Sequence, residues 1–155
     1  MKKEEILQHL IEAKKAHIQW LEKAKLLVNG IKIKEYSIPI DATECEFGKW
    51  FYSDAQKLSA LSNNPLECMQ SIELLHFELH TIYLKIFHIY FNDEEKGFFS
   101  KIFSFKKKQI TPTQQQQAME HFYQMEKISH DLVAQIEKLH RRILAIPEEK
   151  LEKIM

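Results

Sequence analysis

Two histidines four residues apart, His76 and His80, have the residue type and spacing that suit metal binding. On an α-helix this spacing turns the side chains by about 40° and separates them by about 6 Å, so both imidazoles can share one cation. Zinc proteases use the same spacing, with a glutamate directly after the first histidine as general base. Phe77 stands at that position and Glu78 falls on the opposite face of the helix, so the protease interpretation fails.

A third histidine, His17, interrupts an apolar stripe near the start of the chain. A buried imidazole needs partners for both ring nitrogens, and each missing partner costs about 1–3 kcal/mol. Burial also disfavours the charged form of the ring. One interpretation is that His17 and His76 are ordinary core residues hydrogen-bonded to neighbouring carbonyls. The other is that they are ligands.

Cys45 is the fourth candidate ligand. Gly48 allows a tight turn into a helix, and Phe47 and Trp50 can anchor that turn in the core, which leaves the thiol at a loop-to-helix junction. Three imidazoles and one thiolate form a four-coordinate set that suits zinc, with ligand distances of about 2.0–2.3 Å. Such a site is closed to substrate water, and we find no phosphate loop or serine elbow, so we expect no enzyme.

The composition limits the classes of protein that could carry this site. A chain of 155 residues fits one domain at roughly 100–200 residues per domain. The 22 basic and 22 acidic residues leave a net charge of zero, which argues against nucleic acid as a partner. Two cysteines and no secretory leader favour the cytoplasm. The most apolar stretch, Ile82 to Phe91, contains Lys85 and His88 and is too short to cross a bilayer.

Only three glycines and four prolines interrupt the chain, so we expect an all-α fold. Apolar residues recur every three or four positions over 2–28, 65–92 and 113–147, which predicts three long helices. A shorter helix is expected over 48–61, after a long loop. The predicted architecture is an antiparallel four-helix bundle. The expected core positions are Ile6, Leu10, Ala13, His17, Trp20, Ala24 and Leu27, then Trp50, Phe51, Leu58 and Leu61, then Met69, Ile72, His76, Leu79, Tyr83, Ile86 and Tyr90, and finally Ala118, Phe122, Met125, Ser129, Leu132, Ile136, Leu139 and Ile143.

Turn residues and composition divide the chain further. Asn29 and Gly30 should end the first helix, and Asn64 and Pro65 should cap the third. We expect a zinc-binding core over 1–92, a connection over 93–112, a completing helix over 113–147 and a tail over 148–155. The connection carries an aromatic and basic cluster that either tucks onto the bundle or forms a surface for a partner protein or membrane. Its residues are Phe98, Phe99, Phe103, Phe105, Lys101, Lys106, Lys107 and Lys108.

Three motifs resemble the chemoreceptor zinc-binding domain, a bacterial cytoplasmic helical bundle. They are His17-Ile-Gln-Trp20, Cys45-Glu-Phe-Gly48-Lys-Trp50-Phe-Tyr52 and His76-Phe-Glu-Leu-His80, and the resemblance covers residues 12–84. It implies one zinc ion held by His17, Cys45, His76 and His80. It also implies a sensory role, because such domains are attached to chemotaxis receptors and diguanylate cyclases and report zinc or oxidants such as hypochlorous acid.

We expect no receptor signalling region and no cyclase in this chain, so the resemblance leaves its output open: an unknown signalling partner, pairing of two chains, or zinc binding alone. Two alternatives also stay open, a metal-free helical interaction module and a di-iron bundle resembling hemerythrin. The latter would need bridging carboxylates on the core stripes. We expect Cys68 to be a small buried hydrophobe. The remaining histidines are expected outside the site, namely His9, His88, His121, His130 and His140.

Overall fold

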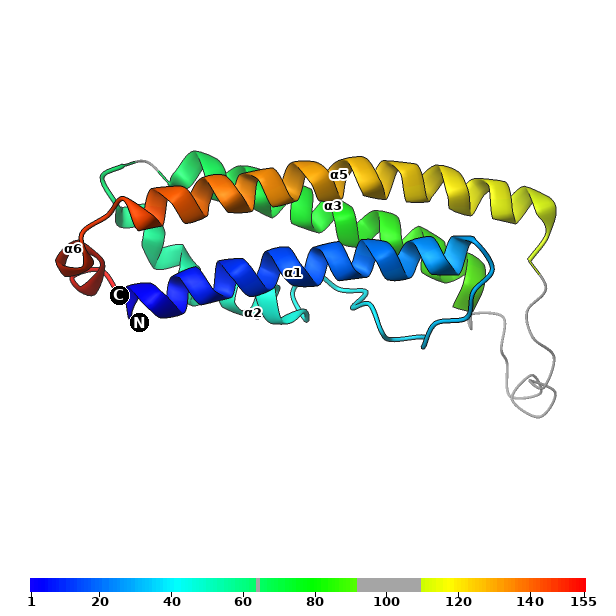
Figure 1. Ribbon diagram of the computed structural model, residues 1–155, viewed down its shortest axis with the longest axis horizontal. Coiled ribbons are helices and arrows are strands. Elements are labelled where there is room, and N and C mark those ends of the chain that lie inside the picture. Colours follow the sequence, from blue (N-terminus) through cyan, green and yellow to red (C-terminus); the bar gives the residue numbers. More distant parts are fainter. Residues whose placement is uncertain (64, 92–109) are drawn as a thin grey trace.

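Three long helices form the frame of the molecule (Figure 1). The computed structural model describes residues 1–63, 65–91 and 110–155. Its elements are α1 (Lys3–Val28), α2 (Glu46–Phe51), the 3₁₀ helix η1 (Asp54–Ala60), α3 (Leu66–Phe91), α5 (Pro112–Leu144) and α6 (Glu148–Glu152). All of these elements are helical, which confirms the all-α class for the described residues. The Asn64 cap and the 98–108 aromatic and basic cluster lie outside them.

The helix directions bring the middle of α1 beside the middle of α3. In Figure 1, α1 and α3 run the same way, and α5 runs against both. Two hydrogen bonds join the start of α1 and the residue before α3 to the end of α5. Lys3 Nζ donates to the Leu144 carbonyl at 2.8 Å, and Asn63 Nδ2 donates to the Arg142 carbonyl at 3.2 Å. The loop between α1 and α2 therefore returns along the bundle.

α1 ends where the sequence predicts. Gly30 adopts a φ of 85°, a conformation that side chains with a Cβ rarely tolerate. The Gly30 N–H donates to the Leu27 carbonyl at 3.0 Å and the Ile31 N–H to the Leu26 carbonyl at 2.9 Å. This pair of bonds is the Schellman motif, which satisfies the last carbonyls of the helix and turns the chain back.

α5 begins with a reciprocal cap between Thr111 and Gln114. The Thr111 hydroxyl accepts from the Gln114 N–H at 3.1 Å, and the Gln114 side chain accepts from the Thr111 N–H at 3.0 Å. Pro112 occupies the first turn, where its missing N–H is not needed. The helix thus starts one residue before the predicted range of 113–147 and ends at Leu144.

The prediction of one helix over 48–61 is wrong. The segment forms α2 and then η1, with a break at Ser53, whose φ of −117° and ψ of −95° are not helical. The Ser53 hydroxyl donates to the Lys49 carbonyl at 2.6 Å and so takes a bond that a continuing helix would make. The residues predicted to face inward are nevertheless buried, because the 3₁₀ turn carries Leu58 to the core.

Part of the predicted tail over 148–155 is helical. It contains α6, which follows Pro147 and buries Leu151 against the rest of the core. Pro147 is placed where helices commonly restart, because its fixed φ suits a helix N-terminus. The tail therefore closes the end of the bundle at which both termini lie (Figure 1).

The predicted core positions are buried, with two exceptions. Trp20 and Tyr90 are only partly buried, whereas the other predicted positions of the long helices are enclosed. Cys68 is fully buried, as expected for a small hydrophobe. No helix among the described residues is long and apolar enough to span a membrane. The stripe that carries His17 and His76 thus lies inside the bundle.

Candidate metal centre

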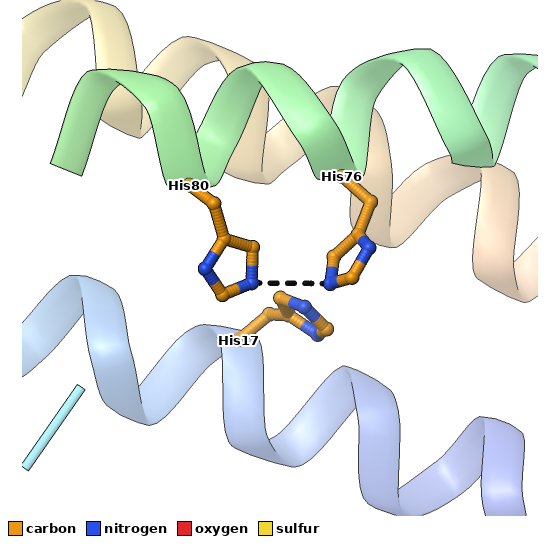
Figure 2. Close-up of side chains that lie close together, drawn as sticks. All are labelled: His17, His76 and His80. Atoms are coloured by element: carbon orange, nitrogen blue, oxygen red, sulfur yellow. Dashed lines mark hydrogen bonds between the residues drawn. The ribbon is translucent and has the colours of Figure 1, made fainter. Parts of the chain in front are cut away.

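Three histidines converge in the middle of the bundle. His17 from α1 and His76 and His80 from α3 place one ring nitrogen each within 4.8 Å of the others. Figure 2 shows the two α3 rings pointing toward the α1 ring. His17 and His76 are 0% exposed and His80 is 4% exposed. Three buried histidines in this arrangement can together hold a metal ion.

The backbone sets the orientation of two of these rings. His17 Nδ1 lies 2.5 Å from the Ala13 carbonyl oxygen, and His80 Nδ1 lies 2.9 Å from the Pro39 carbonyl oxygen. Because a carbonyl oxygen can only accept, each Nδ1 carries the proton, and the lone pair of each ring is on Nε2. A hydrogen bond from the far ring nitrogen to a carbonyl is the usual support of a metal-binding histidine.

His76 occupies the centre of the group. Its Nε2 lies 3.1 Å from His80 Nε2 (the dashed line in Figure 2) and 3.3 Å from Cys45 Sγ. Its Nδ1 is buried without a hydrogen-bond partner, and so is Nε2 of His17. Unpaired polar atoms at this depth are unfavourable unless something else satisfies them.

Cys45 reaches the group from the junction before α2. It is the N-cap residue of that helix, and its sulfur accepts the Gly48 N–H at 3.2 Å. The thiol is 1% exposed and approaches the Ala42 carbonyl oxygen at 3.4 Å. The compact group of nitrogens within 4.8 Å contains the three histidines but not Cys45, which contacts it through His76.

Gly48 is needed for a different reason from the one predicted. A Cβ at this position would lie 1.7 Å from the Ala42 carbonyl oxygen and 3.3 Å from Cys45 Sγ. The close approach of the Ala42 backbone, rather than a special turn, therefore requires glycine. This approach holds the loop before α2 against the start of that helix and so fixes the position of the thiol.

The donor atoms fit zinc in type, and two of their separations fit a tetrahedral site. For bonds of about 2.0–2.3 Å in a tetrahedron, neighbouring donors are separated by about 3.3–3.6 Å. The 3.1 Å between Nε2 of His76 and Nε2 of His80, and the 3.3 Å between Nε2 of His76 and Sγ of Cys45, are close to those separations. The unpartnered Nε2 of His17 would gain the partner it lacks. The residues present therefore suit a zinc ion.

Burial determines which of the three histidines and Cys45 are charged in the absence of metal. It lowers the pKa of His17 to about 4 and that of His76 to about 2, and it lowers the pKa of His80 as well. It raises the pKa of the Cys45 thiol. At neutral pH the rings are thus neutral and ready to donate lone pairs, whereas the thiol must lose a proton to bind a metal.

Aromatic side chains enclose the group. Phe47 makes edge contacts with His17 and His76 at centroid distances of 5.6 and 5.1 Å. Trp20 does so with His17 and His80 at 4.5 and 5.5 Å. These walls keep water from most of the site.

Sequence reasoning missed two supporting groups. The Ala13 carbonyl lies one helical turn before His17 and could have been found from the four-residue spacing alone. The Pro39 carbonyl could not, because no local pattern predicts which loop carbonyl meets His80. Trp20, an expected core position and the last residue of the first motif, packs at the site as expected, because its ring contacts two of the histidines.

The five remaining histidines lie outside the compact group of three. His9 stacks on Trp50 at a centroid distance of 4.8 Å. Among the described residues that group also contains no carboxylate, which a hemerythrin-like di-iron centre would need as a bridge.

Comparison with known proteins adds an independent finding. Residues 17–87 match the model of a protein family described as chemoreceptor zinc-binding domain. The matched segment begins at His17 and includes Cys45, His76 and His80. No curated protein and no solved structure matches the chain. The family match confirms the resemblance seen in the three sequence motifs.

Proposed function

Residues 17–87 carry a chemoreceptor zinc-binding domain, and from that premise we propose that this chain is a zinc-binding sensory or regulatory protein. In the proposed site, His17, Cys45, His76 and His80 hold one zinc ion per chain. The observation that carries the proposal is Nε2 of His17, which is buried without a partner and lies beside two further imidazoles from α3.

The donor chemistry favours zinc over calcium and magnesium. Calcium and magnesium take oxygen ligands, and the compact group offers only nitrogens. A thiolate and three neutral imidazoles suit zinc, which imposes no geometry through its d electrons. Bound zinc supplies a cross-link, and it would join α1, the loop before α2 and α3 through the side chains named above.

Cys45 is the redox-sensitive member of this set. In the reaction we propose, hypochlorous acid oxidises the thiolate by two electrons to a sulfenic acid and is itself reduced to chloride. The oxidised sulfur is a poorer donor, so the site would hold its metal less tightly. This chemistry supports a response to oxidants through the metal site, passed on to a partner protein.

The proposal extends to the organisation of the chain. Residues 1–92 would form the zinc-binding core, and α5 would complete an antiparallel four-helix arrangement in which α2 and η1 take the second position. A non-catalytic role is proposed because all four donors would be occupied by the metal. Two free cysteines support a reducing compartment such as the cytoplasm.

A metal-free interaction module is the second candidate. The contacts of His76 with His80 and Cys45 favour it, because they satisfy several polar atoms without a metal. The unpartnered Nε2 of His17, which a metal would satisfy, argues against it.

Elemental analysis of the full chain, purified without added metal, separates these candidates. We expect about one zinc per chain, as for a single four-coordinate site. His17→Ala should lose the metal, whereas His130→Ala, whose side chain is 87% exposed on α5, should keep it. Wild-type protein free of metal after reloading with zinc and dialysis would overturn the proposal, and so would full occupancy of the His17→Ala variant.

A further inference from the structure

Trp20 differs from its neighbours around the candidate metal site. The three histidines, Cys45 and Phe47 are all buried. Trp20 touches two of the histidines but is only partly buried. It therefore borders both the site and the solvent, a position that none of the buried members shares.

The rest of the site is closed by elements that have other roles. α5 packs against both α1 and α3. The loop before α2 contributes the Pro39 carbonyl and Cys45, each of which is held by a hydrogen bond or contact to the group. Phe47 fills the space beside His17 and His76. Moving any of these would disturb a ligand or its support.

Trp20 contacts two ligand rings, as Phe47 does, but it differs from Phe47 in being only partly buried. Its ring offers no ligand atom for zinc, and its edge contacts are with the sides of His17 and His80, the two rings whose orientation the backbone already sets. An outward rotation of Trp20 would leave the carbonyl partners of both imidazoles in place. The side chain thus covers two ligand rings without supplying a ligand atom.

We propose that Trp20 is the gate of the metal site and that it sets the rate at which metal enters and leaves. The inference rests on the proposed function. A cover that must open in both directions slows association and dissociation by the same factor, so the dissociation constant stays nearly unchanged. A residue that only positions ligands would instead change affinity.

The test compares Trp20→Ala, Trp20→Leu and Trp20→Phe in the full chain, with Ile18→Ala as control. Ile18 lies two residues away on α1 and is 40% exposed. Zinc association is followed by stopped flow, and zinc dissociation is followed by transfer to an excess of a coloured chelator. Circular dichroism checks that each variant is folded, and Trp20→Leu keeps the test available if the alanine variant unfolds.

Both rates should rise together by about tenfold in the alanine and leucine variants, the factor expected from the loss of two aromatic edge contacts. Trp20→Phe should restore slow exchange, and Ile18→Ala should match wild type. Unchanged rates, or a faster dissociation with unchanged association, would overturn the gate while leaving zinc binding intact. A wild-type chain that binds no zinc would instead refute the proposed function on which the gate rests.

Discussion

Nε2 of His76 lies 3.3 Å from the sulfur of Cys45, although the two residues are 31 positions apart in the chain. The contact joins the long helix α3 to the N-terminus of the short helix α2. It places a thiol beside imidazoles that burial keeps neutral. When the Cys45 thiol loses its proton, its thiolate becomes a soft anionic donor for a cation at this site.

Replacing Cys45 should weaken zinc binding far more than replacing the other thiol. Cys45→Ser removes the proposed anionic ligand, so we expect zinc affinity to fall by more than about 100-fold, the upper end of what loss of an outer-shell partner costs. Cys68→Ser is the matched control, because Cys68 is also fully buried and lies on α3. Competition titration with a zinc indicator measures both variants. Equal affinities would show that the sulfur of Cys45 is not a ligand.

Zinc binding at neutral pH should release about one proton. The pKa values of His17 and His76, near 4 and 2, leave no proton on the rings to displace, whereas the raised pKa of Cys45 keeps the thiol protonated. Affinity should therefore rise about tenfold per pH unit from pH 6.5 to 8, and fall as the pH drops. Calorimetry in buffers of different ionisation enthalpy counts the protons. Release of three or more would mean that the imidazoles are charged before zinc binds.

Gly48→Ala should damage both stability and zinc binding. The new Cβ would meet the Ala42 carbonyl oxygen at 1.7 Å, so the backbone that positions Cys45 must shift. Gly30→Ala is the control. It strains a positive φ, has open space around the new Cβ and does not touch the site, so it should lower the free energy of unfolding by about 1 kcal/mol and leave zinc binding unchanged. Thermal unfolding and zinc titration are measured together. Normal zinc affinity in the Gly48 variant would contradict the role of that backbone contact.

Tyr83→Phe should leave stability unchanged or raise it slightly. The Tyr83 hydroxyl is buried without a hydrogen-bond partner, and burial raises its pKa to about 12. The folded state thus resists ionisation that the unfolded state undergoes near pH 10. Tyr83 therefore lowers stability as the pH rises from 10 toward 12, and is neutral below pH 10.

Urea unfolding at pH 7 and pH 11 tests this expectation. The Phe variant should lose less stability at pH 11 than wild type, and Tyr123→Phe, at a position 60% exposed, should behave like wild type. A marked loss of stability at pH 7 in the Tyr83 variant would reveal a hydrogen bond that the geometry does not contain.

The long helices could be predicted because each one satisfies a local rule. The stripe from Ile6 to Leu27 repeats at helical spacing, and Gly30 ends the helix by a bond pattern that depends on nearby residues only. The break at Ser53 is different. There the Ser53 hydroxyl competes with a backbone N–H for the Lys49 carbonyl, and the apolar pattern on either side does not indicate which donor forms the bond.

The site could be predicted in part for the same reason. His76 and His80 share a helix, so their spacing alone brings their rings together. That His17 joins them depends on how α1 packs beside α3, for which the signals were the histidine on an apolar stripe and the family resemblance of the motif that it begins. The Pro39 carbonyl depends on the path of a loop without repeating structure, so no residue pattern could foretell its contact with His80.

The most direct test of the account is X-ray absorption at the zinc edge of the zinc-loaded full chain, with Cys45→Ser as the paired sample. We predict about three nitrogen scatterers at about 2.0 Å and one sulfur at about 2.3 Å in wild type, and loss of the sulfur shell in the variant. A wild-type spectrum with only nitrogen and oxygen neighbours, or a sulfur shell that survives the substitution, would contradict it.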